Sequence, residues 1–374
     1  MQNSADALAI SIDYVPPVAS TAQIANSSYV GKFERLPKWL NCVPLVIQWL
    51  WLSLRYSSVS LPSVANPHIT CGGMVGESKQ EYFNCMGDFG RGYIAPFIAI
   101  SVRNKLALEQ AISAMHKQHM HFPVVVKPDL GWCGYGVRRI NDVRALASYL
   151  EKFPQGQTIL LQRYLPEAGE AGVFYMRHPE QEKGDILGVL FRYYPQVIGD
   201  GVHTIAQLIA KDARLQRISQ NKLHQPDYTP EAIPAPGEEV RLALIGSTRI
   251  GGLYCDGSEY ITTQLIEVFD RIAKDMPEFY AGRFDIRYES LERLRQGKGF
   301  TIMEVNGAGS EAVHAWDPKY SIRESYRIIF AKQRLLFQIG AVNRKRGYRP
   351  IGLSRLAKLH FFQQALIKRY PLSN

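Results

Sequence analysis

Two neighbouring segments, residues 283–287 (Arg-Phe-Asp-Ile-Arg) and 300–306 (Phe-Thr-Ile-Met-Glu-Val-Asn), constrain the fold of this chain most. Both have the pattern of β-strands. Successive side chains of a strand point to opposite faces, so Glu304 and Asn306 project from the same face. If the two strands pair, Asp285 joins them. The segments therefore predict a sheet that carries two carboxylates and an amide on one face.

This set of side-chain oxygens is the kind that Mg²⁺ binds while it keeps waters and phosphate oxygens. The alternative is a pair of half-buried strands whose acidic side chains simply face solvent. The two segments alone leave both interpretations open.

From Gly72 onward, strand and helix patterns alternate without tandem repeats, which predicts an α+β fold. The 374 residues are enough for two or three subdomains. Residues 224–238 hold four prolines and are predicted to form a long connection. The other predicted strands are 97–101, 122–127, 158–162 and 185–192, and the predicted helices are 104–118, 142–153, 204–213 and 261–276.

A glycine-rich segment follows the strand that ends at Lys127, with glycines at 131, 134 and 136. A lysine at this place supplies a point charge for phosphate, and glycines let the backbone bend closely around an anion. Neither a Walker loop nor a Rossmann fingerprint occurs. A glycine-rich turn by itself is more often structural, so the phosphate-binding interpretation depends on what accompanies it.

In this order, the segments resemble the ATP-grasp superfamily of carboxylate–amine ligases from about Gly72 to Tyr326. The resemblance implies two α/β lobes that clasp MgATP, with Mn²⁺ as an alternative ion. It implies that the metal is held by Asp285, Glu304 and Asn306. It also implies phosphate contacts from Lys79 and Lys127, under a loop that contains Gly131, Gly134 and Gly136.

The resemblance also implies nucleotide contacts at the positions of this sequence that match the family's interlobe hinge and its ribose-binding acid. The hinge positions are Gln162, Arg163, Tyr164 and Leu165, and the acid is Glu170. Arg192 opens a segment, through Leu208, that resembles cyanophycin synthetases, and we expect it in the nucleotide site. Arg241 and Arg249 fall in a similar order there and are expected to bind substrate.

The sequence Gly282-Arg283-Phe-Asp285 resembles D-alanine–D-alanine ligases, in which this arginine steadies the oxyanion of the tetrahedral intermediate. Arg283 is therefore the expected catalytic residue. The family ending Asn-x-x-Pro-Gly is replaced here by Asn306-Gly-Ala-Gly309-Ser310. Gly309 or Ser310 is thus the candidate for the backbone amide of the oxyanion hole.

The resemblance implies an ATP-dependent ligase that forms a C–N bond through an acyl phosphate and releases ADP and phosphate. The alternatives are an ATP-grasp-like phosphotransferase and a membrane-docked nucleotide-binding protein without turnover. The expected partners are carboxylate and amine substrates, either small or lipid-linked, and no nucleic acid is expected. The sequence leaves a homo-oligomer open. Because Asp285 and Glu304 are expected as metal ligands, their amide variants are expected to fold normally.

Four regions are predicted: an arm with a Trp-rich apolar segment (1–71), a first lobe with the phosphate loop (72–165), a second lobe with the metal site (166–326) and a basic helical tail (327–374). The five cysteines are scattered and form no C-x-x-C pair, which suits a reducing compartment. We therefore expect the cytoplasm, with a peripheral position on the inner membrane face as an extension of that prediction.

The membrane prediction depends on two segments. Residues 36–56 are apolar and Trp-rich, but their densest part is only about 20 Å long as a helix, whereas a bilayer core is about 30 Å thick. Residues 325–374 contain eleven Lys and Arg and no acidic residue. An apolar stripe is expected in this tail, at Leu356, Leu359, Phe362, Leu366 and Tyr370. The alternative is that both segments pack on the protein itself.

Overall fold

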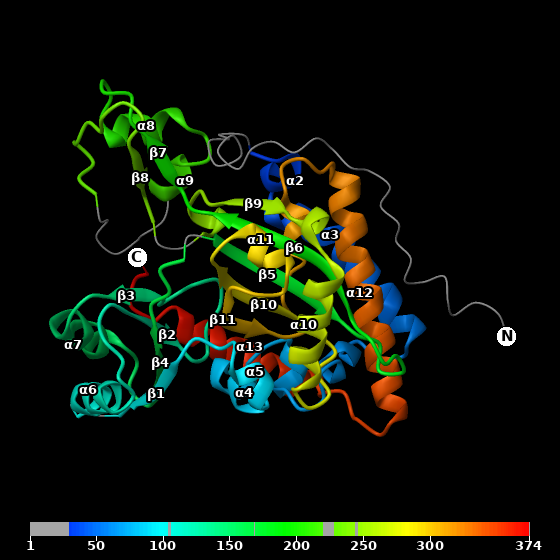
Figure 1. Cartoon of the computed structure of the whole chain (residues 1–374). Helices are drawn as coiled ribbons and strands as arrows, with labels where there is room; N and C mark the ends of the chain where they lie inside the picture. The colour runs from blue at the N-terminus through cyan, green and yellow to red at the C-terminus, as the bar shows by residue number, and fades with distance from the viewer. Residues whose placement is uncertain (1–29, 104–105, 168, 220–227, 244–245, 374) are drawn as a thin grey trace.

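The computed structural model describes residues 30–103, 106–167, 169–219, 228–243 and 246–373. Its two main sheets are antiparallel and lie side by side, with helices around them (Figure 1). The four-stranded sheet has the order β1-β4-β2-β3 and the five-stranded sheet the order β11-β10-β5-β6-β9. A two-stranded sheet, β7-β8, belongs to a small projection. The predicted α+β class is confirmed.

The four-stranded sheet covers residues 97–163 of the chain. Its strands are β1 (Phe97–Val102), β2 (Val124–Pro128), β3 (Arg138–Ile140) and β4 (Gln157–Arg163). Helices α6 (Ala107–Lys117) and α7 (Val143–Lys152) pack on it. The Asp142 side chain caps α7 by accepting a hydrogen bond from the Ala145 amide, as an N-cap aspartate commonly does.

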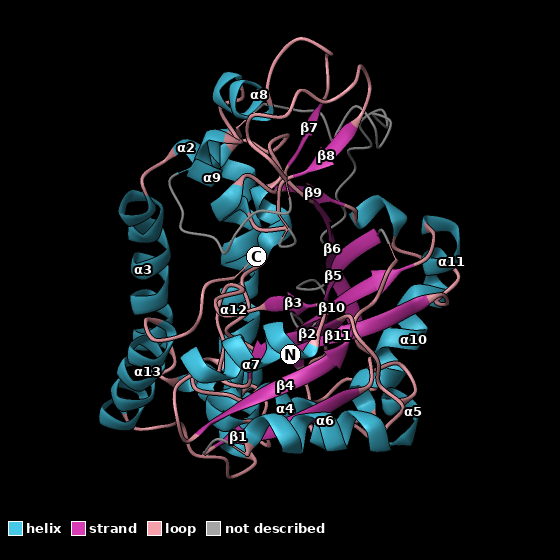
Figure 2. Cartoon of the chain, turned by 90° about the vertical axis from the view of Figure 1, so that its left-hand side faces the viewer, coloured by secondary structure: helices cyan, strands magenta, loops and turns pink. Residues whose placement is uncertain are grey.

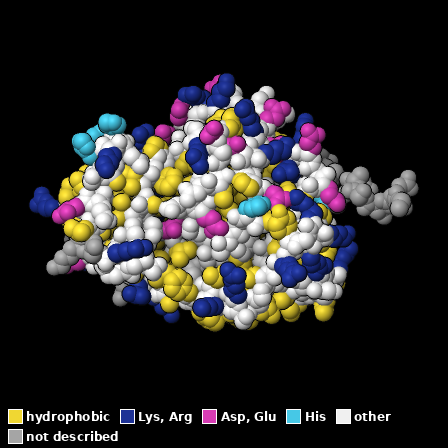
Figure 3. Space-filling view, turned by 90° about the horizontal axis from the view of Figure 1, so that it is seen from below, with side chains coloured by type: hydrophobic (Ala, Val, Ile, Leu, Met, Phe, Trp, Pro, Cys, Tyr) yellow, Lys and Arg dark blue, Asp and Glu magenta, His cyan; other side chains and the backbone are white. Residues whose placement is uncertain are grey.

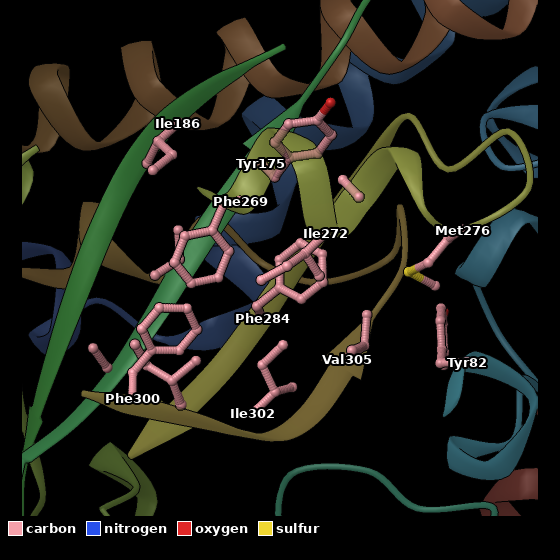
Figure 4. Packing of buried hydrophobic residues seen from close by; sticks show 14 of the residues in the cluster. Tyr82, Tyr175, Ile186, Phe269, Ile272, Met276, Phe284, Phe300, Ile302 and Val305 are labelled. Carbon is pink, nitrogen blue, oxygen red and sulfur yellow. The ribbon is translucent and has the colours of Figure 1, made fainter. Parts of the chain in front are cut away.

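The five-stranded sheet carries the largest hydrophobic core on one of its faces. Its strands are β5 (Gly169–Met176), β6 (Asp185–Tyr193), β9 (Leu253–Asp256), β10 (Ala281–Tyr288) and β11 (Phe300–Asn306). Along the chain, helix α10 (Thr263–Lys274) lies between β9 and β10, and helix α11 (Leu291–Arg295) lies between β10 and β11. Figure 4 shows Phe269 of α10 against Phe284 and Phe300 of the sheet. Because strand side chains alternate, residues 283, 285 and 287 face the other way.

Strand β5, in the centre of this sheet, was not predicted from the sequence. Glycines inside a strand weaken its signal, and β5 contains Gly169 and Gly172. Gly172 lies opposite Asp285, and a Cβ there would sit 3.0 Å from Asp285 Oδ1 and 3.0 Å from Arg283 Cδ. The glycine therefore leaves room for charged side chains on this face.

The remaining elements surround the sheets. Helix α12 covers part of the five-stranded sheet, where Leu336 and Ile339 pack with Met176 and Ala281. These remaining helices and strands are α2 (Lys32–Arg35), α3 (Lys38–Arg55), α4 (Lys79–Cys85), α5 (Asp88–Arg91), β7 (Gln196–Ile198), α8 (Ile205–Lys211), α9 (Gln216–Ser219), β8 (Glu239–Arg241), α12 (Ile322–Lys345) and α13 (Leu353–Ile367). The division into lobes at 72–165 and 166–326 stays a prediction.

Candidate functional site

Strands β10 and β11 pair in the register that brings the predicted metal ligands together. Asp285 lies opposite Glu304, and Arg283 lies opposite Asn306. By strand alternation all four side chains are on the face opposite to the one on which Phe284 and Val305 pack into the core. The Asn306 Nδ2 group donates a hydrogen bond of 3.1 Å to Asp285 Oδ2. The site is therefore built on two neighbouring strands rather than on loops.

Asp285 is the buried centre of this face, and its carboxylate is bound by two arginines. Arg283 donates from Nε and Nη2 over 2.7 and 2.9 Å, and Arg192 donates from Nη2 over 3.1 Å. Only 4% of the Asp285 side chain is exposed. Burial alone would raise the pKa of Asp285, but the Arg192 and Arg283 guanidiniums outweigh it and hold that pKa below its usual range. Asp285 is thus an ionised carboxylate.

A second buried carboxylate, Glu170 of β5, extends this row of charges. It pairs with Arg192 Nη1 at 3.0 Å and Arg287 Nη2 at 3.3 Å, and it accepts a hydrogen bond from the Tyr194 hydroxyl. Burial alone would raise the pKa of Glu170, but the two arginines and the tyrosine have the larger combined effect and hold that pKa below its ordinary value. Arg192 therefore joins Glu170 to Asp285. Both Glu170 oxygens have partners, so a ribose contact would compete with them.

Glu304 is the open carboxylate of the site, with 28% of its side chain exposed. Lys79 Nζ lies 3.4 Å from Glu304 Oε1. Lys79 is the first residue of α4, which begins after Ser78, and the Ser78 side chain accepts a hydrogen bond from the Glu81 amide. The Lys79 amide donates to the Asp129 carbonyl. These contacts fix the lysine beside the glycine-rich segment.

Lys127 connects the two sheets at the same place. Its Nζ donates to Gln162 Oε1 over 2.7 Å and to the Met303 carbonyl of β11 over 3.3 Å. Burial lowers the pKa of Lys127 to about 8, against the opposing effect of Glu304. A bound anion would favour the charged form of this lysine. The side chain of Gln162 thus positions Lys127, a role that sequence reasoning missed because the two residues lie 35 positions apart.

The glycine-rich loop, residues 129–137, lies directly against Lys79. A Cβ on Gly131 would sit 2.5 Å from Lys79 Nζ, so any side chain there would displace the lysine. Gly134 and Gly136 each have φ of +74°, which favours glycine. The three predicted glycines are therefore each required by the backbone or by the lysine next to it.

Residues 363–373, at the C-terminal end of the described chain, form hydrogen bonds with this loop. Nothing in the sequence predicts this contact. Gln363 Nε2 donates to the Gly131 carbonyl over 3.1 Å, and Gln363 Oε1 accepts from the Gly76 amide at 3.4 Å. The Tyr370 hydroxyl donates to the Leu130 carbonyl over 2.6 Å. Ser373 Oγ donates to the Gly134 carbonyl over 2.7 Å and accepts from the Gly136 amide at 3.1 Å.

We expect Gln363→Ala and Ser373→Ala each to make the glycine-rich loop open more often. Each lost hydrogen bond contributes about 1 kcal/mol, so amide exchange in residues 130–137 should become roughly fivefold to thirtyfold faster. Hydrogen–deuterium exchange followed by mass spectrometry measures this. Gln364→Ala, on the neighbouring half-buried position, is the matched control. Unchanged exchange in both variants would show that these contacts do not restrain the loop.

The predicted hinge is the connection from β4 to β5, between the two sheets. Arg163 is exposed and its amide donates to the Pro96 carbonyl. Tyr164 lies under the Arg139 guanidinium, 4.7 Å from the ring centroid, and Leu165 is half-buried. A backbone contact with adenine at these residues stays a prediction.

The predicted substrate residues lie at two places. Arg241 stacks on Tyr194 at 3.3 Å from the ring centroid, next to the Glu170 group. The Gly309 amide donates to the Gly73 carbonyl and the Ser310 amide to the Gly307 carbonyl, so neither predicted amide is free for an oxyanion in this arrangement. Ser310 Oγ is buried without a hydrogen-bond partner among the described residues. The side chain of Arg249 lies outside the described part of the structure.

The donor set fits Mg²⁺. Among the described residues no group of three or more His, Cys, Asp or Glu is placed to hold a metal. Mg²⁺, however, is usually bound through one or two carboxylates, with substrate phosphates and waters as its other ligands. Glu304 and Asn306 offer oxygens from the open side, and Asp285 lies between them and the arginines. Binding through Asp285 would require Arg283 to release one oxygen.

Two further titratable groups near this site were not predicted. Glu77 is half-buried, its buried Oε2 has no hydrogen-bond partner among the described residues, and desolvation raises its pKa to about 7. Burial likewise lowers the pKa of Lys332, on α12, to about 7, with Glu311 and Arg283 nearby. Glu77 lies two positions before Lys79 in the sequence, whereas only the folding of a distant segment brings Lys332 here.

The comparisons with known proteins agree on one group of enzymes. No family model matches the sequence. The chain is 29% identical over 176 residues to the glutathione biosynthesis bifunctional protein GshAB of Streptococcus agalactiae, which covers 42% of this chain and 22% of that protein. It is 26% identical over 213 residues to cyanophycin synthetase of Synechocystis sp., covering 52% of this chain and 24% of that protein.

Among solved structures, a bifunctional glutathione synthetase from Pasteurella multocida is similar, with 18% identity and a TM-score of 0.39 over 73% of this chain and 38% of that one. The matched part of the chain spans about a quarter of the length of the curated relatives. Their sequence similarity confirms the resemblance to ATP-grasp carboxylate–amine ligases that the motifs predict.

Proposed function

We propose that this protein is an ATP-dependent ligase that joins a carboxylate to an amine through an acyl phosphate. The observation that carries the proposal is the meeting of Lys79, Lys127 and Glu304 from three separate elements beside the glycine-rich loop. Two lysines, an open carboxylate and a tight backbone turn are what the binding of a nucleotide polyphosphate requires. The basic side chains here outnumber the carboxylates, which favours an anionic ligand.

The residues have distinct roles in the proposed reaction. Lys79 and Lys127 hold the β- and γ-phosphates and balance their charge while the γ-phosphoryl group moves to the carboxylate oxygen of the first substrate. Glu304, Asn306 and Asp285 would hold Mg²⁺, which when bound neutralises the phosphate oxygens during transfer. The glycine-rich loop excludes water from the acyl phosphate.

In the second step the amine attacks the acyl carbon, the C–O bond to phosphate breaks, and inorganic phosphate leaves with one oxygen of the original carboxylate. Arg283 lies on the same face as Asp285 and Asn306, which supports the proposal that its guanidinium stabilises the developing oxyanion. The amine loses one proton in the process.

An oxygen-transfer experiment tests this proposal. Purified protein is screened for ADP release with MgATP against amino acids, short peptides and lipid-linked carboxylates, each with and without an amine. With a carboxylate labelled with ¹⁸O, one labelled oxygen should appear in the released phosphate, and ADP release should require both substrates.

Two other outcomes would replace the ligase proposal. ADP release with an alcohol alone, accompanied by a stable phosphorylated product, would show a phosphotransferase. Nucleotide binding without ADP release under any substrate pair would show a nucleotide-binding protein without turnover. The sequence relatives favour neither.

We expect Arg283→Ala to lower the turnover rate by roughly 10²–10³, the usual cost of one lost oxyanion donor. The nucleotide dissociation constant should change little, because Arg283 contacts Asp285 rather than either lysine. Single-turnover rates and nucleotide titrations separate the two effects. Arg293→Ala, on the exposed helix α11, is the control. A collapse of nucleotide binding would place Arg283 in the nucleotide site instead.

The finer features of the function are also proposals. By analogy with the relatives, we propose small carboxylate and amine substrates, with a lipid-linked substrate and a homo-oligomer as extensions. We propose a cytoplasmic location, in keeping with five cysteines that form no disulfide. No helix in the described ranges is both long and apolar enough to cross a bilayer.

A further inference from the structure

Helix α3 has its polarity reversed relative to an ordinary surface helix. Two of its polar side chains face the protein: Asn41 Nδ2 donates to the Phe33 carbonyl over 3.0 Å, and Gln48 Nε2 donates to the Phe330 carbonyl over 2.8 Å. Eight of its apolar side chains face outward, with exposed fractions from 40% to 81%, at Trp39, Leu40, Val43, Val46, Ile47, Leu50, Trp51 and Leu54. An ordinary surface helix presents its polar side chains to water.

The inner side of α3 fixes the helix without help from the outer side. Leu52 is buried against Phe337 of α12, and the Trp49 ring meets the same phenylalanine edge-on at 5.0 Å. The outer apolar face therefore makes no contribution to this packing. Isolated exposed apolar residues are common, but a continuous patch of this size indicates an interaction site.

Helix α13 adds to the same side of the molecule. Figure 2 shows α3 and α13 along one edge, beyond α12. Leu353, Phe361 and Phe362 are exposed by 58%, 70% and 49%. The apolar stripe expected in this tail is largely turned inward instead, since Leu366 is buried and Tyr370 stacks on Phe153. The exposed apolar residues of α13 therefore differ from the predicted stripe, with which they share Phe362.

This apolar face has a positively charged border. Neither residues 36–76 nor residues 325–373 contain an Asp or Glu. Arg55, Arg344, Arg355 and Lys358 are exposed on these segments, and Arg344 Nη1 donates to the Tyr56 carbonyl just beyond the end of α3. Figure 3 shows Lys and Arg side chains beside hydrophobic ones along one border of the molecule.

We propose that α3 and α13 form a docking face for an anionic lipid surface, with α3 lying in the plane of the interface. Tryptophan side chains settle at the boundary between headgroups and acyl chains, where Trp39 and Trp51 would lie. Each basic residue near an anionic leaflet strengthens binding about fivefold. A second copy of the chain fits the face less well, because a twofold contact would bring like charges together.

Sedimentation with vesicles tests the apolar part of the face. The full chain should bind vesicles of phosphatidylcholine and phosphatidylglycerol in equal parts, and bind pure phosphatidylcholine vesicles at least tenfold more weakly. The double variant Ile47→Glu/Leu54→Glu should lose binding, because both side chains point outward and their replacement leaves the fold intact. Val202→Glu, at a position 69% exposed on the small projection, is the matched control and should bind normally.

The charged part of the face needs its own variant. Arg355→Gln/Lys358→Gln should weaken binding about thirtyfold, and added salt should weaken the unaltered protein similarly. Lys117→Gln/Arg144→Gln removes two exposed charges from α6 and α7, and should have no effect. Equal recovery in the supernatant with and without anionic vesicles overturns the proposal. So does a stable dimer that Ile47→Glu/Leu54→Glu dissociates, since the face would then join two copies. Binding is measured without nucleotide or substrate, so the result does not depend on the ligase proposal.

Discussion

Glu304→Gln is expected to fold normally and to lose ATP-dependent turnover by roughly a thousandfold, since a metal ion contributes several kcal/mol of charge stabilisation to phosphoryl transfer. The side chain is 28% exposed, and its one ion pair, with Lys79 at 3.4 Å, is at the open side of the site. Removal of this charge therefore costs little stability but deprives Mg²⁺ of its most accessible carboxylate.

Turnover at saturating MgATP and thermal unfolding are measured together for this variant. Glu267→Gln, at an exposed position of α10, provides the same chemical change away from the site and should match the unaltered protein in both. A Glu304→Gln enzyme that retains near-normal turnover, with or without excess Mg²⁺, would remove Glu304 from the metal site.

Asp285→Asn should behave differently, because it is expected to unfold more easily as well as to lose turnover. The sequence alone predicts a normally folded variant, since it identifies Asp285 only as a metal ligand. In the structure, however, Asp285 is the carboxylate partner of Arg192 and Arg283 at 3.1 and 2.7 Å. Removal of one partner from a buried ion pair costs about 3–5 kcal/mol, because the other charges stay buried.

Chemical denaturation of the two amide variants separates these roles. The midpoint should fall clearly for Asp285→Asn and stay within error for Glu304→Gln. Asp88→Asn, at an exposed position of α5, should also leave the midpoint unchanged. If Asp285→Asn were as stable as the unaltered protein, the two arginines would have to find other partners, and the ion-pair row would not be a stabilising feature.

Many residues of this site could be predicted because they lie close together in the sequence, on or just after short strands. The alternation of β10 and β11 places Glu304 and Asn306 on one face, and the pairing of the two strands adds Asp285. The glycines at 131, 134 and 136 likewise follow a strand that ends in a lysine. Local patterns of this kind depend on backbone geometry, which a sequence shows directly.

The rest depends on contacts between distant residues. Arg192 reaches Asp285 across 93 positions, and Gln363 reaches Gly131 across 232. No periodicity predicts such pairs. For α3 the apolar pattern predicts a helix but leaves open which side faces the protein, because hydrogen bonds from Asn41 and Gln48 decide its orientation.

Helix α13 contacts the glycine-rich loop with one side and presents Phe361 outward with the other, only two residues from Gln363. Thermodynamic linkage then imposes a reciprocity. If lipid binding shifts the loop between open and closed forms and thereby changes nucleotide affinity by some factor, nucleotide must change lipid affinity by that same factor. The ratio of nucleotide affinities with and without lipid should therefore equal the ratio of lipid affinities with and without nucleotide. That one ratio measures how strongly the two surfaces of this helix are coupled.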